Sequence, residues 1–312
     1  MKVFLPGGAG LVGLNLIQKI LLLHENWEIL VVDKKLEAVE IGKKLFPNVR
    51  FLCENLTYKG NQNWYKEILD YDCCVFLQAE IGNLDANQFE INNVLSTEVI
   101  LEEIKKSKIK RIIHISSSVV NSVSNDLYTK TKIKQEILVL REFPKALVLR
   151  PTLMFGWFDR KHLGWLFRFM KKIPIFPIPG EGRFKRQPLF VGDFCKIIVK
   201  ALEDKSISGI YNISGLEKID YVELMSLLKY FSRSKTIFIF LPISIFDLFL
   251  KIWSLISPNP AFTSSQLKAL TAGDEFEIID WPKIFSIKRT SLKEALSITF
   301  QHKIYSRVFI PF

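Results

Sequence analysis

Short apolar runs alternate with amphipathic stretches through the first half of the chain. Runs at residues 2–5, 27–32, 50–53, 73–77, 111–116 and 146–149 have the length and composition of buried strands. Between them, residues 11–23, 93–106 and 127–141 carry apolar side chains at helical spacing. Strands that alternate with helices predict a parallel sheet. We therefore expect an α/β fold with a Rossmann-type, doubly wound sheet.

The pattern changes near Arg150 and Pro151. Aromatic and basic residues follow, then a Pro/Gly stretch at 173–182, and then an apolar run at 209–213 that predicts one more strand returning to the sheet. The rest is mostly helical and hydrophobic. We predict a first domain over residues 1–155, with a returning segment near 186–216, and a smaller, mostly helical C-terminal region over 156–312.

Residues 236–256 form an apolar segment as long as a membrane span. Pro242 splits it, and Asp247 and Lys251 lie one helical turn apart in its second half. We interpret it as a strand ending near Leu241 and an amphipathic helix from about Pro242, because proline is favoured at the start of a helix. We expect a buried or groove-lining helix, with peripheral membrane contact as the alternative.

Composition excludes several classes of protein. The chain has 312 residues, of which 48% are hydrophobic and 24% charged, as in an ordinary globular protein. Its net charge of +11 favours an anionic partner, either a phosphorylated ligand or an acidic membrane surface, and a solvated basic surface is an equal alternative. The basic residues form no aromatic-laced block, so we expect no nucleic acid. The scattered cysteines and histidines predict no metal site.

The N-terminus has no secretory pattern, because a glycine turn interrupts the first apolar run after Pro6. A cytoplasmic protein is expected, with membrane association left open.

A glycine-rich turn carries the first candidate chemistry. Gly8, Gly10 and Gly13 follow the first predicted strand and open the first predicted helix. Such glycines allow a tight turn, close approach of a pyrophosphate to the backbone, and close helix–strand packing. Asp33 ends the second strand about 20 residues after Gly13, where a carboxylate binds adenosine ribose hydroxyls. Plain turn glycines are the alternative, but this order of features predicts that the domain at 1–155 binds NAD(P).

The residues after Asp33 bear on the choice of cofactor. Lys34 and Lys35 could approach the 2′-phosphate of NADP, whereas the Asp33 carboxylate would repel it. We therefore expect NAD, with NADP as the alternative.

Tyr128 and Lys132 lie one turn apart on one face of a predicted helix. A nearby ammonium lowers the pKa of a phenol, and a phenolate can take a proton from an alcohol while hydride leaves for the cofactor. Ser116, Ser117 and Ser118 end the fifth strand, at the sheet edge where ligands bind in such folds. Chance pairing and plain loop serines are the alternatives, but the positions favour a catalytic set.

These motifs resemble those of the extended short-chain dehydrogenase/reductase family, especially its NAD-dependent nucleotide-sugar epimerases and reductases. KVFLPGGAGLVG is similar to the family's opening motif, DCCVFLQA to its fourth strand, and NVLSTEVILEEI to its Asn-Val-x-Gly-Thr helix. HISSSVV and YTKTK match its serine and Tyr-x-x-x-Lys motifs. LRPTLMFG and RQPLFVGDF resemble two further family segments.

The resemblance implies a role for each matching residue. Ser117, Tyr128 and Lys132 would be catalytic, with Tyr128 as acid/base. The substrate would contact Ser118 and, through its diphosphate, Arg186, while Asp193 would support the fold. Cofactor contacts would come from Gly7, Gly8, Gly10, Leu11, Val12, Gly13, Asp33, Asn55, Leu56, Gln78, Ala79, Asn93, Tyr128 and Lys132. Asn55 stands where the family often has an acid.

The leading hypothesis is an NAD(P)-dependent epimerase or ketoreductase acting on a nucleotide-activated sugar, in surface polysaccharide synthesis, with residues 156–312 binding the substrate. Relatives also imply a homodimer formed through the helices around Asn93 and Tyr128. Ser118 and Val119 occupy the place of the Asp-Glu pair of the family's dehydratases, which argues against water elimination. The alternatives are a non-catalytic NAD(P)-binding assembly subunit at a membrane, and a reductase of a lipid or small alcohol.

Overall fold

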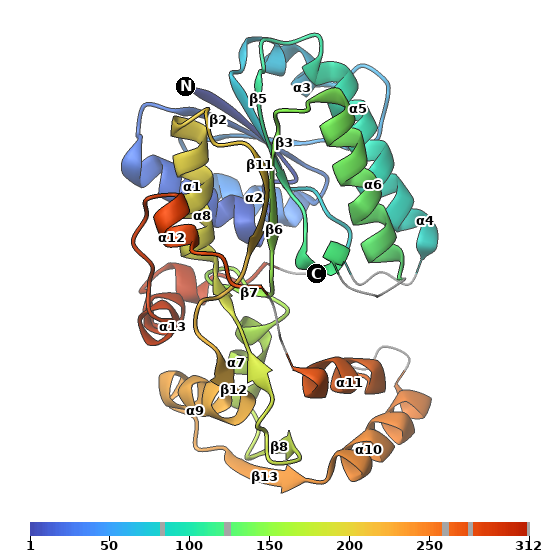
Figure 1. The fold of residues 1–312 in the computed structure, drawn as a ribbon, viewed down its shortest axis with the longest axis vertical. Helices are drawn as coiled ribbons and strands as arrows, with labels where there is room; N and C mark the ends of the chain where they lie inside the picture. Colours follow the sequence, from blue (N-terminus) through green and yellow to red (C-terminus); the bar gives the residue numbers. More distant parts are fainter. Residues whose placement is uncertain (82–84, 122–125, 258–261, 274–276, 311–312) are drawn as a thin grey trace.

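The computed structural model describes residues 1–81, 85–121, 126–257, 262–273 and 277–310. Figure 1 shows two lobes, an upper one built around a central sheet and a lower one in which β8 (Ile175–Pro179), β13 (Ile237–Leu241) and α10 (Ile243–Ile256) mark the far end. The chain crosses between the lobes several times.

The central sheet confirms the expected Rossmann-type fold. Its seven strands run in the order β11-β6-β5-β4-β1-β2-β3, and all neighbouring pairs are parallel. Such strands are buried on both faces, which is why they appeared as continuous apolar runs. The predicted strand at 209–213 is confirmed and lies at the edge beside β6. The strands are β1 (Lys2–Pro6), β2 (Glu28–Asp33), β3 (Arg50–Cys53), β4 (Cys73–Phe76), β5 (Arg111–Ile115), β6 (Leu147–Pro151) and β11 (Gly209–Ile213).

Helices cover both faces of this sheet (Figure 1). On one face, α1 (Leu11–Leu23) packs against α8 (Val191–Glu203), and the apolar side chains of both enter one core with β1 and β2. On the other face, α5 (Ser96–Ile104) and α6 (Leu127–Glu142) enclose a second core with Trp64 and Phe76. Further elements are α2 (Leu36–Leu45), α3 (Asn63–Glu67), η1 (Ile68–Asp70) and η3 (Ser118–Asn121).

The helix predicted at 93–106 has an irregular start. After α4 (Ala86–Phe89), residues Glu90–Leu95 form a π-helical turn (η2) that continues into α5. The Ser96 hydroxyl donates to the backbone carbonyl of Asn92 at 2.6 Å. A π turn is a local irregularity that often accompanies functional sites. Asn93, a predicted site residue, lies within this turn.

The lower lobe has its own core, in which α7, α9 and α13 pack together. Short strand pairs accompany the helices: β7 with β10, β9 with β12, and β8 with β13. Trp281, Phe285 and Ile310 instead join the core under the main sheet, so the C-terminal segment returns to the upper lobe. The remaining elements are α7 (Leu163–Met170), α9 (Tyr221–Ser232), α11 (Ser264–Ala272), α12 (Trp281–Ile284), α13 (Leu292–Gln301), η4 (Tyr305–Arg307), β7 (Met154–Phe155), β9 (Lys185–Arg186), β10 (Leu189–Phe190) and β12 (Ile219–Asp220).

The segment at 236–256 differs from its prediction in one respect. It forms β13 and α10 as expected, with Pro242 at the N-cap of the helix. The expectation that the helix is buried is wrong, because none of its residues is buried and Leu255 is 86% exposed, while a groove-lining position stays a prediction. In the described part of the chain the helix packs mainly against α11, so most of its apolar side chains point outward. Within the described residues, no helix has the length and apolarity needed to cross a bilayer.

Candidate functional site

The glycine turn lies between the end of β1 and the start of α1. Gly7 has a φ of +73°, and its N–H donates to the Val32 carbonyl of β2 at 2.8 Å. At Gly13, an added Cβ would lie 2.1 Å from the Gly8 carbonyl oxygen, so the helix can approach the turn only because that side chain is missing. An added Cβ at Gly10 would meet only the Gly7 carbonyl oxygen, at 4.0 Å, so this position is much less crowded, as a backbone position that a ligand approaches would be.

The N-terminus of α1 provides the donors for a phosphate. Gly10 is its N-cap, no side chain caps it, and its first turn has no acidic residue. Its N–H groups and the positive end of the helix dipole are therefore available to an anion. Leu11 and Val12 are half-buried here and pack against the first core.

Asp33 lies directly beside this turn. Its two carboxylate oxygens accept from the N–H groups of Ala9 at 3.3 Å and Lys35 at 3.1 Å. Burial raises the pKa of Asp33, while these two hydrogen bonds oppose the shift. The carboxylate at the end of β2 is thus held next to the glycine turn, as the sequence predicted.

The other predicted cofactor residues fall into two groups. Gln78 and Ala79 follow β4. A Cβ added to Gly7 would lie 2.5 Å from the Cα of Gln78, so Gln78 lies directly against the glycine turn. Asn55 and Leu56 follow β3, at the far end of the same sheet edge. The Asn55 side chain accepts from the N–H and hydroxyl of Thr57 at 3.0 and 2.8 Å, so it is engaged in a local turn.

Asn93 is fully buried and connects two parts of the site. Its Oδ1 accepts from the Glu80 N–H at 2.6 Å, and its Nδ2 donates to the Thr131 hydroxyl at 2.9 Å. The side chain therefore joins the loop after β4 to α6, one residue before Lys132. This arrangement lets Asn93 hold the loop after β4 against α6, while its predicted contact with the cofactor stays a prediction.

The structure brings Ser117 and Tyr128 together. Their side chains are hydrogen-bonded, with Ser117 just past the end of β5 and Tyr128 in the first turn of α6. Burial raises the pKa of Tyr128, and the bond from Ser117 opposes that shift. The expectation that a neighbouring ammonium lowers this pKa is not met, because burial is the largest influence on Tyr128 and the Lys132 ammonium donates to the Ile115 carbonyl instead.

Lys132 lies one turn further along α6 and is fully buried. Its Nζ donates to the Ile115 carbonyl at the end of β5, at 2.9 Å. Burial lowers the pKa of Lys132 to about 7, although Glu136 raises it. The lysine is thus held between β5 and α6 in a state that can lose its charge near neutral pH.

Sequence reasoning missed a buried acidic group behind this lysine. Glu136 accepts from the Ser116 hydroxyl and from Arg150, whose Nε and Nη2 lie 2.9 and 2.6 Å from its oxygens. Arg150 also donates to Asn121 at 2.9 Å. The signal was available in the sequence, because Glu136 follows Lys132 by four residues, as Lys132 follows Tyr128.

Sequence reasoning also missed two cations, Arg160 and Lys161, that join Lys35 near the cofactor turn. Burial lowers the pKa values of Lys35, Arg160 and Lys161, and the Arg160 charge adds to the shift of the two lysines. The Glu80 charge opposes all three shifts, and the Asp33 charge opposes those of Lys35 and Arg160. The Lys161 ammonium donates to the Ile81 carbonyl at 2.9 Å. Arg160 and Lys161 come from the loop after β7, so the sequence separation of more than a hundred residues hid them.

The predicted substrate residues lie on different lobes. Ser118 is half-buried in η3, beside Ser117. Arg186 is in β9, where it is paired in register with Ile219. Burial lowers the pKa of His162 and the Arg186 charge adds to that shift, whereas burial raises the pKa of Tyr221 and the Arg186 charge opposes it. Arg186 is therefore on the lower lobe and Ser118 on the upper one.

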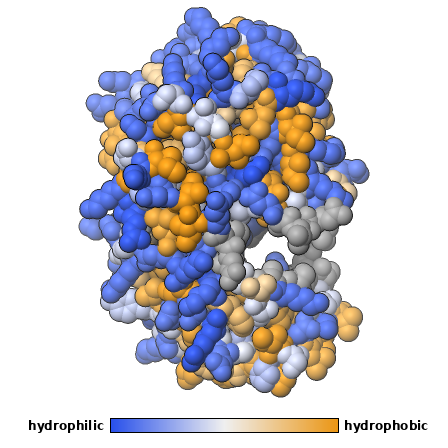
Figure 2. Space-filling model, in the orientation of Figure 1, coloured by the Kyte–Doolittle hydropathy of each residue, from blue (hydrophilic) through white to orange (hydrophobic). Residues whose placement is uncertain are grey.

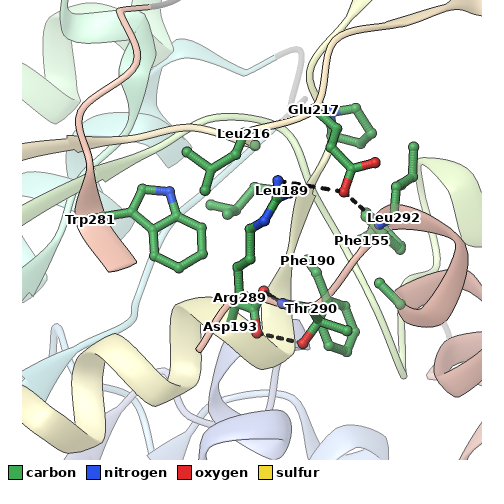
Figure 3. Close-up of a pocket in the computed structure, with 13 residues that line it drawn as sticks. Phe155, Leu189, Phe190, Asp193, Leu216, Glu217, Trp281, Arg289, Thr290 and Leu292 are labelled. Carbon is green, nitrogen blue, oxygen red and sulfur yellow. Dashed lines mark hydrogen bonds and ion pairs between the residues drawn. The ribbon is translucent and has the colours of Figure 1, made fainter. Parts of the chain in front are cut away.

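A small cavity of about 30 Å³ lies away from these residues (Figure 3). Arg289 points toward Glu217 there, with an ion pair of 3.8 Å, and Asp193 accepts from the N–H and hydroxyl of Thr290, both at 2.7 Å. These groups satisfy one another, and the space suits about one water molecule. Asp193 thus supports the fold, as expected.

Comparison with known proteins agrees with this geometry. The sequence profile of the NAD dependent epimerase/dehydratase family matches residues 3–214, and the chain belongs to this family. The family membership confirms the resemblance found in the sequence and, at the level of the family, the expectation of NAD, whereas the activity of this chain stays a prediction.

Individual relatives are distant. The chain is 29% identical over 141 residues, 45% of its length, to NADH dehydrogenase [ubiquinone] 1 alpha subcomplex subunit 9, mitochondrial, of Arabidopsis thaliana. It is 26% identical over 237 residues, 72% of its length, to the protein of the same name from Mus musculus. The chain spans only 35% and 60% of these two relatives.

A solved structure shows the same fold. UDP-glucuronic acid 4-epimerase from Bacillus cereus, in complex with UDP-glucuronic acid and NAD, superposes with a TM-score of 0.69 at 22% identity. The match covers 96% of this chain and 98% of that one, so it includes both lobes.

Proposed function

We propose that this chain is an NAD-dependent epimerase or ketoreductase that acts on a nucleotide-activated sugar. The observation that carries the proposal is the bond between Ser117 and Tyr128, with buried Lys132 one turn further along α6. This set lies at the end of β5, on the sheet edge that also holds the glycine turn. Ligands of doubly wound sheets bind at this edge.

The residues present fit NAD. The uncapped start of α1 and the uncrowded backbone at Gly10 suit a pyrophosphate, and Asp33 suits ribose hydroxyls. When bound, the cofactor supplies a hydride acceptor or donor and, in its oxidised form, a positive charge near the phenol.

Tyr128 is the residue that holds and moves the proton. Because its pKa is raised by burial, the phenol is protonated at neutral pH in the ligand-free chain. Ser117 stabilises the phenolate through its hydrogen bond, and a cation nearby lowers the pKa further. The proton of a substrate hydroxyl then passes to the Tyr128 oxygen in oxidation and returns from it in reduction.

The substrate class follows from charge and fold. Arg186 offers a guanidinium from the lower lobe, and a diphosphate is the ligand that such a group binds best. The Bacillus cereus protein of the same fold is described with UDP-glucuronic acid bound. We place the nucleotide diphosphate of the substrate at Arg186 and its sugar between Ser118 and Tyr128.

The apolar side chains of α6 and the turn before α5 favour a homodimer. Ile133, Ile137 and Ile91 are exposed on these elements. Pairing through them would bury this surface and leave the glycine turn free. Light scattering of the purified chain measures whether it is a monomer or a dimer.

A second candidate is an NAD-binding subunit of a larger assembly without turnover. The curated relatives favour it, since both are named as subunits of an NADH dehydrogenase. The Ser117, Tyr128 and Lys132 set argues for the enzyme, because a passive subunit needs no buried lysine beside a hydrogen-bonded phenol.

A ligand screen tests the proposal. The purified chain is heated with NAD or NADP, alone and with UDP-sugars, and a ligand that binds only the native state raises Tm. We expect the largest shift with NAD and a UDP-sugar together, and Arg186→Gln should remove the UDP-sugar part alone. Cofactor that is recycled indicates an epimerase, and stoichiometric NADH consumption a reductase. A shift with NAD that no nucleotide sugar increases would contradict the substrate assignment.

A further inference from the structure

The far end of the lower lobe presents a large apolar surface. Figure 1 places β13 and α10 together along this end, and Figure 2 shows hydrophobic side chains there. In β13, Ile237, Ile239 and Phe240 are exposed. In the described residues, β8 pairs with one edge of β13, and the other edge has no partner strand. Proteins normally cover or protect an unpaired strand edge. We name β13 and α10 together the apolar end.

The arrangement of α10 is that of an interfacial helix. Successive residues are about 100° apart, so an arc of roughly 120° holds only apolar side chains. These are Ile245, Leu248, Phe249, Ile252, Leu255 and Ile256, and all of them are exposed. A polar stripe with the Asp247–Lys251 ion pair of 2.7 Å borders the arc, and Phe246 on the inner face packs against Phe262.

Charge identifies what the apolar end binds. Residues 224–273 contain five basic side chains and a single acidic one, Asp247. Lys171 and Lys172 precede β8, while Arg233 and Lys235 precede β13, and all four are exposed. Because the two strands are parallel and in register from Ile175 and Ile237, these cations meet at one end of the strand pair.

We propose that the apolar end docks on an anionic lipid surface, with α10 lying in the interface and these four cations contacting lipid headgroups. An apolar arc beside basic residues is what such a surface binds. A second copy of the chain is disfavoured, because a symmetric contact would bring two sets of these cations into one interface. The docking leaves the sheet edge with Tyr128 free, and it does not depend on the reaction catalysed there.

Sedimentation with vesicles tests this docking on the full chain. The probes are vesicles of phosphatidylcholine alone and vesicles of equal parts phosphatidylcholine and phosphatidylglycerol. We expect binding to the second kind and at least about 10-fold weaker binding to the first. Leu248→Ser with Leu255→Ser should weaken binding to the anionic vesicles at least about 10-fold.

Matched control variants distinguish docking through the apolar end from nonspecific hydrophobic adsorption and from the effect of net charge. Leu22→Ser with Leu23→Ser changes two leucines on α1 that are 65% and 55% exposed, and it should leave binding unchanged. Lys171→Gln with Lys172→Gln should weaken binding about 10-fold or more, whereas Lys43→Gln with Lys44→Gln on α2 should not.

Three outcomes would overturn the proposal. The first is no sedimentation with either kind of vesicle, which would point to a protein partner. The second is binding that the leucine changes in α10 do not weaken. The third is a dimer in solution that becomes a monomer when Leu248 and Leu255 are changed, which would assign the surface to a second copy.

Discussion

The helices α1 and α10 are alike in sequence and opposite in setting. Both are rich in leucine and isoleucine, with 13 and 14 residues. Six residues of α1 are buried, because the sheet lies on one side of it and α8 beside it. No residue of α10 is buried. Whether an apolar helix is buried or exposed therefore depends on which other elements pack against it.

The same contrast separates the two candidate interaction regions. At the cofactor edge, the side chains of Asp33, Asn93 and Glu136 have hydrogen-bond partners that fix their positions. At the apolar end, large side chains meet solvent. The first region is built for a small ligand of defined shape, and the second for a broad surface.

Truncating the core of α1 should have the largest effect on stability. Leu16 is fully buried in the first core, so Leu16→Ala leaves a cavity. We expect it to lower the free energy of unfolding by about 3 kcal/mol. Urea unfolding measures this value. A loss below about 1 kcal/mol would mean that α1 is packed far more loosely than described.

Removing the buried lysine should stabilise the chain while abolishing its chemistry. The pKa of Lys132 is about 7 in the folded chain and 10.5 in the unfolded one. Between these two pKa values the unfolded state binds more protons than the folded state, so the free energy of unfolding rises with pH. Below pH 7 the lysine is charged in both states, and the folded chain carries the full cost of burying that charge.

Lys132→Met removes this cost but also removes the hydrogen bond to the Ile115 carbonyl. We expect a net gain on the order of 1–2 kcal/mol at pH 6 and a smaller one at pH 9. Urea unfolding at both values measures it, with Lys130→Met on the exposed side of α6 as the control. A variant less stable than the wild type at pH 6 would rule out this account of the lysine.

The charge at the end of β2 should set the choice of cofactor. Asp33→Asn keeps an oxygen for only one of the two N–H groups, that of Ala9 or that of Lys35, and it removes the charge that repels a 2′-phosphate. We expect NAD to bind about 10-fold more weakly and NADP more tightly. Calorimetric titration with each cofactor measures both constants. Asp72→Asn, at the opposite edge of the sheet, is the control, and equal values for Asp33→Asn and the wild type would contradict the assignment.

Truncating α10 should have the smallest effect on stability. Leu255 is 86% exposed, so Leu255→Ala should change the free energy of unfolding by less than about 0.5 kcal/mol. The comparison with Leu16→Ala is made in the same urea titration. A loss similar to that of Leu16→Ala would show that α10 is covered in solution by another part of the chain or by a second copy.

Much of the upper lobe was predictable from the sequence. Strands buried on both faces leave continuous apolar runs, and the glycine turn and Asp33 have fixed places in such a fold. The two-residue strands β7, β9, β10 and β12 left no periodic signal, because they are too short to show one. The outward orientation of α10 was also hidden, since an amphipathic pattern does not say whether its apolar side meets protein.

The candidate site was predictable in part. Ser117, Tyr128 and Lys132 are adjacent because one follows a strand and two lie on the next helix. Arg160 reaches the charges of Asp33 and Glu80 from a distant loop, and tertiary contacts of this kind leave no local pattern. Burial also reversed the expected shift in the pKa of Tyr128, since spacing along a helix says nothing about solvent.

One measurement tests the central claim most directly. The wild type and Tyr128→Phe are compared for turnover of the nucleotide sugar found in the screen, together with the Kd for NAD. The account predicts a loss in kcat of about 10²-fold or more, because the phenol oxygen that exchanges the proton is gone, and an NAD Kd within about 3-fold of the wild type. Turnover that survives the change intact would contradict the account.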